Sequence, residues 1–149
     1  MFDKNQVIPI GSDHGGYELK VYLVDQLSKS GYRFKDFGTH SSASVDYPDF
    51  IHPVAQMVDQ GTAAMGIIIC GSGQGASMTA NKYPRVRAGL CWDLEQARLT
   101  RQHNNANIIS LPGRFLEFDK ALEMVRLFLS TEFEGGRHEQ RINKIPISH

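Results

Sequence analysis

Neither sign of charge is in excess in this 149-residue chain, where 16 Lys and Arg balance 16 Asp and Glu. A chain without net charge has no general attraction for nucleic acid or for an anionic membrane. Any anion site must therefore be local. Cysteine is also scarce: the chain has only Cys70 and Cys91, too few for a disulfide scaffold.

Long apolar runs are missing as well. No stretch approaches the roughly 18 residues that a membrane helix needs. Residues 1–6 (MFDKNQ) lack the apolar region of a secretory signal. We therefore expect a cytoplasmic protein whose thiols stay reduced. The length and the 41% hydrophobic content fit a single domain spanning residues 1–149.

Short apolar runs alternate with longer amphipathic segments along the chain. Strands are expected at residues 7–11, 32–37, 65–70, 86–91 and 107–111. Helices are expected at residues 14–30, 47–60, 75–82, 93–102 and 117–130, with a last one at 136–144. This rhythm predicts an α/β fold with a doubly wound, five-stranded parallel sheet and an extra C-terminal helix. For five strands we expect the flavodoxin-like order 2-1-3-4-5.

Two polar segments follow the strands that this order places side by side. The sequence GSDHGG at residues 11–16 ends strand one, and CGSGQG at residues 70–75 ends strand three. Ligands of such sheets bind at the carboxyl ends of strands where the order reverses. Asp13, His14 and Cys70 are therefore predicted to face one crevice.

The second segment carries alternate glycines, Gly71, Gly73 and Gly75, leading into a helix. Successive backbone N–H groups there form an anion site, for a phosphate or for an oxyanion created during a reaction. The string matches neither G-x-G-x-x-G nor a P-loop, and an ordinary strand-to-helix turn is the alternative. The same donors favour the thiolate of Cys70, which otherwise packs as a small hydrophobe. Cys91 is interpreted as packing.

Two further polar clusters lie outside these loops. One is the sequence RQHNNAN at residues 101–107, which contains His103. It is either part of a functional site or a turn that caps the preceding helix. GGRHEQR at residues 135–141 places Arg137 and Arg141 four residues apart, so on a helix they share one face. Two guanidinium groups there suit a phosphate, although a solvated basic face is the alternative. Arg114 follows Pro112 and Gly113 and adds another charge.

Five motifs together resemble the ribose-5-phosphate isomerase B family, which includes the galactose-6-phosphate isomerase subunits. They are residues 11–16, DYPD at 46–49, ICGSGQG at 69–75 with ANK at 80–82, residues 101–107, and EGGRH at 134–138. Their order and spacing agree with the family from about residue 7 to residue 145.

The resemblance implies an aldose–ketose isomerase that converts ribose 5-phosphate and ribulose 5-phosphate without metal or cofactor. Cys70 would carry the proton through a cis-enediolate, and His103 would open the sugar ring. Substrate would be held by Asp13, His14, Tyr47, Gly71, Ser72, Gly73, Gln74, Gly75, Asn104, Arg114, Arg137 and Arg141. Among these, Ser72 would share in catalysis by stabilising the enediolate oxygen, and Asp13 by holding a hydroxyl.

Two departures within the family bear on this expectation. Some members replace the cysteine base with a glutamate just after the loop, where this chain has Ala76. The chain therefore resembles the cysteine type. Many members have threonine at the position of Ser72, and both residues supply a hydroxyl.

The predicted topology also indicates a homodimer, or a dimer of dimers. His103 and Asn104 precede strand five and so lie at its amino end, whereas Cys70 lies at a carboxyl end. A five-residue strand spans about 17 Å. We expect His103 and Asn104 to serve the site of a partner subunit, and residues 134–149 to pack on that partner.

Three alternatives stay open at this point. One is an isomerase of a hexose 6-phosphate, galactose or allose 6-phosphate. Another is a non-catalytic sugar-phosphate-binding subunit. The third is a flavin-binding module, which is disfavoured because Asp13 would repel the flavin phosphate.

Overall fold

A computed structural model describes residues 2–147 of the chain. Its strands are β1 (Val7–Ser12), β2 (Arg33–Asp36), β3 (Gly66–Cys70), β4 (Ala88–Leu90) and β5 (Ile108–Pro112). Its helices are α1 (Tyr17–Lys29), α2 (Tyr47–Asp59), α3 (Gln74–Ala80), α4 (Leu94–Gln102), α5 (Phe118–Ser130) and α6 (Arg137–Ile142). All strand pairs are parallel, which confirms the predicted α/β class.

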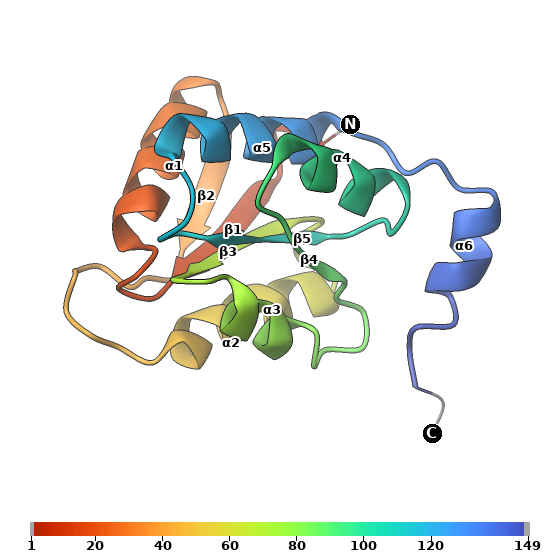
Figure 1. The fold of residues 1–149 in the computed structure, drawn as a ribbon, viewed down its shortest axis with the longest axis horizontal. Helices are drawn as coiled ribbons and strands as arrows, with labels where there is room; N and C mark the ends of the chain where they lie inside the picture. The colour runs from red at the N-terminus through yellow and green to blue at the C-terminus, as the bar shows by residue number, and fades with distance from the viewer. Residues whose placement is uncertain (1, 148–149) are drawn as a thin grey trace.

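Helices cover both faces of the sheet (Figure 1). Helices α1, α4 and α5 lie on one face, and α2 and α3 lie on the other. Two apolar clusters fill the spaces between these layers, one around Ile67 and Phe128 and the other around Ile68 and Val54. Because neighbouring β3 residues point to opposite faces, this strand supplies both clusters and is buried throughout.

The predicted strand order is wrong at one edge. The sheet has the order β2-β1-β3-β5-β4, so β5 rather than β4 lies beside β3. Burial explains the exchange. All five residues of β5 are buried, as a central strand requires, whereas the three residues of β4 are only partly buried. The exchange brings the carboxyl end of β5 next to the carboxyl end of β3.

Helix boundaries agree with the predicted segments to within a few residues. The largest shift is at α1, which begins at Tyr17 instead of His14. The preceding residues form a turn in which the N–H of Gly15 donates to Oδ1 of Asp13 at 2.9 Å. Asp93 accepts from the N–H of Leu94 and caps α4 as predicted.

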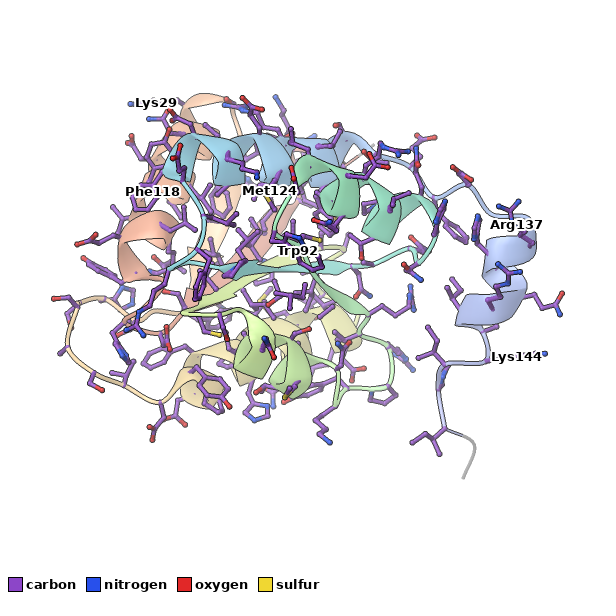
Figure 2. The ribbon with its side chains drawn as sticks, viewed as in Figure 1. Lys29, Trp92, Phe118, Met124, Arg137 and Lys144 are labelled. Atoms are coloured by element: carbon purple, nitrogen blue, oxygen red, sulfur yellow. The ribbon has the colours of Figure 1, made fainter. Side chains whose placement is uncertain are left out.

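The C-terminal helix α6 stands apart from the two layers, beyond the end of α4 (Figure 1). It begins after Gly135 and Gly136, which both take positive φ, and it ends at Ile142, so it is shorter than the predicted segment 136–144. Figure 2 shows Arg137 at its start and Lys144 just past its end. Within residues 2–147, no helix is long and apolar enough to cross a membrane.

Candidate active site

Three loops converge at the carboxyl edge of the sheet. The N–H of Asp13, after β1, donates to the carbonyl of Ile69 at 3.3 Å. The N–H of Gly113, after β5, donates to the carbonyl of Cys70 at 2.8 Å, and the N–H of Arg114 donates to Gly71 at 3.0 Å. The chain therefore brings the ends of β1, β3 and β5 together, with Cys70 in the middle.

Asp13 and His14 are held in fixed positions beside Cys70. The Asp13 residue is 8% exposed, and one carboxylate oxygen accepts from Gly15 within its own turn. Nδ1 of His14 accepts from the N–H of Val45 at 3.2 Å. A neutral His14 therefore carries its proton on Nε2, which leaves a donor for an anion. Val45 belongs to the loop before α2, so this loop helps to set the His14 ring.

The loop after Cys70 turns sharply into α3. Gly73 has φ of 74°, a conformation that glycine adopts without strain. Its carbonyl accepts from the buried hydroxyl of Ser110 on β5 at 2.6 Å. This bond turns the peptide oxygen toward the sheet and fixes the shape of the loop. Oγ of Ser72 accepts from the N–H of Gln74 at 3.3 Å.

Tyr47 and Arg114 cover the two ends of this loop. A Cβ atom added to Gly75 would lie 2.5 Å from Cζ of Tyr47, so glycine leaves room for the ring. A Cβ atom on Gly71 would lie 3.3 Å from the Arg114 guanidinium. The loop thus lies between an aromatic ring and a fixed positive charge. We call residues 11–16 and 70–75 with Tyr47 and Arg114 the Cys70 region.

The remaining predicted residues gather elsewhere, around the end of α4. His103 caps α4, and its ring stacks on that of His138 with centroids 4.2 Å apart. The side chain of His138 comes from α6, as do the exposed guanidinium groups of Arg137 and Arg141. We call His103, Asn104, Glu134, Arg137, His138 and Arg141 the His103 region. The structure therefore places both arginines with His103 of the same chain.

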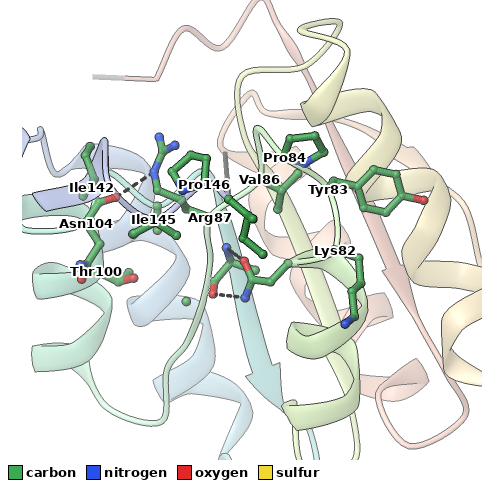
Figure 3. Close-up of a pocket in the computed structure, with 15 residues that line it drawn as sticks. Lys82, Tyr83, Pro84, Val86, Arg87, Thr100, Asn104, Ile142, Ile145 and Pro146 are labelled. Atoms are coloured by element: carbon green, nitrogen blue, oxygen red, sulfur yellow. Dashed lines mark hydrogen bonds between the residues drawn. The ribbon is translucent and has the colours of Figure 1, made fainter. Parts of the chain in front are cut away.

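Two other arginines hold the turn that carries His103 and Asn104. Nε of Arg87 donates to the carbonyl of Asn104 at 3.0 Å (Figure 3). The buried Arg101 donates to Oδ1 of Asn105 at 2.9 Å and to the carbonyl of Ala106 at 2.7 Å. Asn105 takes φ of 46°, which asparagine tolerates better than most residues. The side chains of Arg87 and Arg101 thereby hold this turn in place.

The two regions lie at opposite edges of the sheet. Cys70 pairs with Pro112 at the carboxyl end of β5, whereas Gly66 pairs with Ile108 at its amino end. The N–H of Gly66 donates to Asn107, which follows the His103 turn directly. The length of β5 therefore separates Cys70 from His103 within one chain. The predicted site residues therefore form two groups within one chain, and His103 and Asn104 lie away from Cys70 as the topology predicted.

The environment sets different protonation behaviour in two buried groups. Burial raises the pKa of Cys91 to about 12, so this thiol stays protonated and unreactive. Burial also lowers the pKa of His138, and the charges of His103, Arg137 and Arg141 add to the effect. The nearby carboxylate of Glu134 opposes it. His138 is therefore held toward its neutral form.

A cavity of about 540 Å³ lies away from Cys70, under the C-terminal stretch (Figure 3). Its apolar walls include Val86 and Pro84 on one side and Ile142 and Ile145 on the other, and Asn104 reaches its edge. Apart from Asn104, its lining contains no predicted site residue. We therefore assign the candidate chemistry to the Cys70 region and the His103 region and not to this cavity.

Several contributing residues were missed by sequence reasoning. They are Ser110, which pins Gly73, the Val45 N–H, which holds His14, the arginines Arg87 and Arg101, and the pair Glu134 and His138. Ser110, Val45 and Arg87 act on residues that are distant in the sequence, so no local motif marks them. Arg101, Glu134 and His138 lay within quoted motifs, but the motifs did not indicate these contacts.

The fold and the two regions define an α/β protein with a polar site at the point where the strand order reverses. The model of the Ribose/Galactose Isomerase family matches residues 8–145. Ribose-5-phosphate isomerase B of Escherichia coli strain K12 is 40% identical over 138 residues, or 93% of each chain. The chain belongs to the ribose/galactose isomerase family and is an isomerase.

Solved structures agree over nearly the full length. Ribose-5-phosphate isomerase B of Clostridium thermocellum is 51% identical with a TM-score of 0.92, covering 94% of this chain and 95% of that one. The Mycoplasma genitalium enzyme with bound ribulose-5-phosphate is 40% identical with a TM-score of 0.91, covering 96% of this chain and 95% of that one.

Proposed function

We propose that this chain interconverts D-ribose 5-phosphate and D-ribulose 5-phosphate, with Cys70 as the base. The observation that carries the proposal is the place of Cys70, at the meeting point of three strand ends and at the start of an N–H-rich loop. Relatives named ribose-5-phosphate isomerase B support the substrate, including one solved with ribulose-5-phosphate.

The reaction moves one proton between neighbouring carbons. The Cys70 thiolate takes the proton from C2 of the aldose, and the electrons of that C–H bond form a cis-enediolate. The protonated thiol then returns this proton to C1, while the hydroxyl proton on O2 passes to O1, so that the carbonyl forms at C2 and the thiolate is restored. N–H groups of residues 71–75 and the Ser72 hydroxyl stabilise the enediolate oxygen, where one such donor contributes about 2.7–4 kcal/mol. Asp13 holds a substrate hydroxyl, and Tyr47 lines the pocket beside the loop.

The substrate phosphate and the sugar ring need the second region. In this proposal, Arg137 and Arg141 bind the phosphate together with His14 and Arg114. His103 moves the proton that opens the furanose ring, and Asn104 binds a hydroxyl. Because the phosphate is remote from the reacting carbons, its binding energy positions the substrate for the transition state.

The separation of the two regions supports a homodimer with shared sites, or a dimer of dimers. A single chain keeps them at opposite sheet edges, so a complete site combines the Cys70 region of one chain with the His103 region of its partner. The C-terminal segment 134–149, described as far as Ile147, is proposed to pack on that partner. The exposed apolar side chains of Ile145 and Ile147, which are 58% and 80% exposed, suit such a contact.

Two free thiols suit a reducing compartment, so we propose that the enzyme acts in the cytoplasm. The proposed substrate places the reaction in the pentose phosphate pathway. The second candidate substrate is a hexose 6-phosphate, galactose or allose 6-phosphate. The family description, which names galactose as well as ribose, is the observation that favours it.

A coupled assay that compares ribose 5-phosphate with allose and galactose 6-phosphates tests the proposal. Ribose 5-phosphate should give the highest kcat/KM. In the Cys70→Ala variant, kcat should fall by roughly 10²–10⁴-fold, the range of general acid–base catalysis. Cys91→Ala is the matched control and should retain turnover. A Cys70→Ala enzyme with near-normal turnover would contradict the mechanism, and a preference for hexose phosphates would contradict the substrate.

A further inference from the structure

Three potential metal ligands from three separate segments meet in the His103 region. His103 ends α4, Glu134 lies in the stretch before α6, and His138 lies on α6. Their donor atoms all lie within 4.8 Å of one another. A backbone bond from the N–H of Glu134 to the carbonyl of Gln102, at 3.0 Å, holds the connecting stretch against α4.

One of these donors is buried without a hydrogen bond. His138 is 6% exposed, and its Nε2 has no hydrogen-bond partner. The nearest charged group is a carboxylate oxygen of Glu134 at 3.6 Å. That distance is too long for a hydrogen bond. A buried polar nitrogen with no partner is unfavourable, so the structure has a specific atom that a ligand would satisfy.

The same spacing fits two ligands of one metal ion. Zinc binds histidine nitrogen at about 2.0–2.1 Å and carboxylate oxygen at about 2.0–2.2 Å, usually in a tetrahedron, so neighbouring ligand atoms lie about 3.4 Å apart. The observed 3.6 Å between His138 and Glu134 is close to this value. The donor of His103 lies within 4.8 Å of the other two, but its ring now stacks on His138 at an interplanar angle of 12°, so metal binding requires the His103 ring to rotate out of this stack.

Charges of both signs surround the three side chains. The carboxylate of Glu134 attracts a cation, while Arg137 and Arg141 repel one. An ion that forms strong bonds to imidazole therefore fits better than Mg²⁺ or Ca²⁺, which rely on charge and prefer oxygen ligands.

We propose that His103, Glu134 and His138 form a binding site for a divalent transition-metal ion of the Zn²⁺ type, which inhibits the isomerase by occupying His103. Two histidines and one glutamate leave a fourth position open to water or to an anion. The inhibition rests on the proposed role of His103, whereas the binding does not. The site would make the enzyme sensitive to free zinc.

Direct binding is measured first, on untagged Cys70→Ser protein, because a thiolate would bind zinc by itself. Isothermal calorimetry and competition with a chromophoric chelator should show one Zn²⁺ per chain. In that background, His138→Gln and Glu134→Gln should each weaken binding at least tenfold. Co²⁺ should give the visible absorption of a tetrahedral site, and Mg²⁺ should not bind.

The matched control is His52→Gln, which removes an exposed histidine outside the cluster. It should leave zinc affinity unchanged. Zinc binding that persists undiminished in both His138→Gln and Glu134→Gln would overturn the proposal, as would absence of binding to the parent. Because Glu134 is exposed, its variant is expected to fold even if His138→Gln does not.

Inhibition is measured second, with Cys70 intact. Zinc should inhibit reversibly, EDTA should restore activity, and Glu134→Gln should need at least tenfold more zinc for the same inhibition. Equal sensitivity of parent and Glu134→Gln would assign the inhibition to Cys70 and overturn the inhibitory part. If zinc binds as expected but the chain turns over no sugar phosphate, the proposed function fails while the metal site stands.

Discussion

The Cys70 region and the His103 region are built in different ways. Main-chain hydrogen bonds between the ends of β1, β3 and β5 hold the Cys70 region, and its proposed oxyanion donors are backbone N–H groups. The His103 region consists of side chains on a turn and on the short helix α6. It is joined to the body by the backbone bond of Glu134, the ring stack of His103 and His138, and the side chain of Arg101.

This difference matches the two tasks that we propose for the regions. Charge that develops during proton transfer is best stabilised by donors that do not reorganise, and a loop fixed on a sheet edge supplies them. Ring opening and phosphate binding tolerate more adjustment, and segments with few buried contacts can move at low free-energy cost. A second chain can therefore deliver the His103 region to a finished Cys70 region.

The prediction with the largest expected effect tests whether one active site combines the Cys70 region of one chain with the His103 region of its partner. Cys70→Ala and His103→Ala chains should each be nearly inactive. After co-refolding, the mixture should regain about a quarter of the parent activity, since half of randomly paired dimers are mixed and each holds one intact site of two. The coupled isomerase assay measures this recovery.

Pairs of variants from the same region provide the control. A mixture of Cys70→Ala and Asp13→Ala chains should regain no activity, because every site then lacks one residue of the Cys70 region. Recovery in this pair, or none in the cross-region pair despite demonstrated subunit exchange, would contradict shared sites.

Much of the Cys70 region was predictable, because its placement depends on local pattern and one topological rule. Apolar periodicity located β1 and β3, and the switch-point rule put Asp13 beside Cys70. The strand order 2-1-3-4-5 failed because it follows from common topology alone. The correct order depends on how β4 and β5 are buried, which is a property of the packed sheet.

The His103 region was predictable only as separate motifs. Nothing in the sequence near His103 indicates that His138 stacks on it, because that contact depends on the chain reversal at Gly135 and Gly136. The hydrogen bond from the Ser110 hydroxyl to the Gly73 carbonyl was missed for the same reason, because it joins residues 37 positions apart. Contacts of this kind depend on the folded structure and cannot be read from local sequence patterns.

A prediction with a smaller expected effect tests whether the arginines of α6 bind the substrate phosphate. In Arg141→Met, kcat/KM for ribose 5-phosphate should fall by roughly 10- to 100-fold, the loss expected for hydrogen bonds to a charged group. KM should rise more than kcat falls, because the phosphate contacts are similar in substrate and transition state. Steady-state kinetics measure both.

Lys144→Met is the matched control for Arg141→Met. It removes one positive charge from the end of the same exposed segment. It should change kcat/KM little. An equal loss in both variants would indicate a general electrostatic effect of the segment and not a phosphate contact by Arg141.

The smallest effect concerns the folding of the His103 region itself. Burial lowers the pKa of His138 below its usual value of 6.5, so the unfolded chain binds this proton more readily than the folded one. Stability therefore rises with pH up to about 6.5 and loses this contribution as the pH falls below it. His138→Gln should flatten the dependence of Tm on pH below about 6.5. Glu134→Gln should steepen it, because removing the carboxylate lowers the pKa of His138 further. Thermal scans in matched buffers measure the slopes, and slopes that change in the same direction in both variants would contradict this coupling of His138 to Glu134.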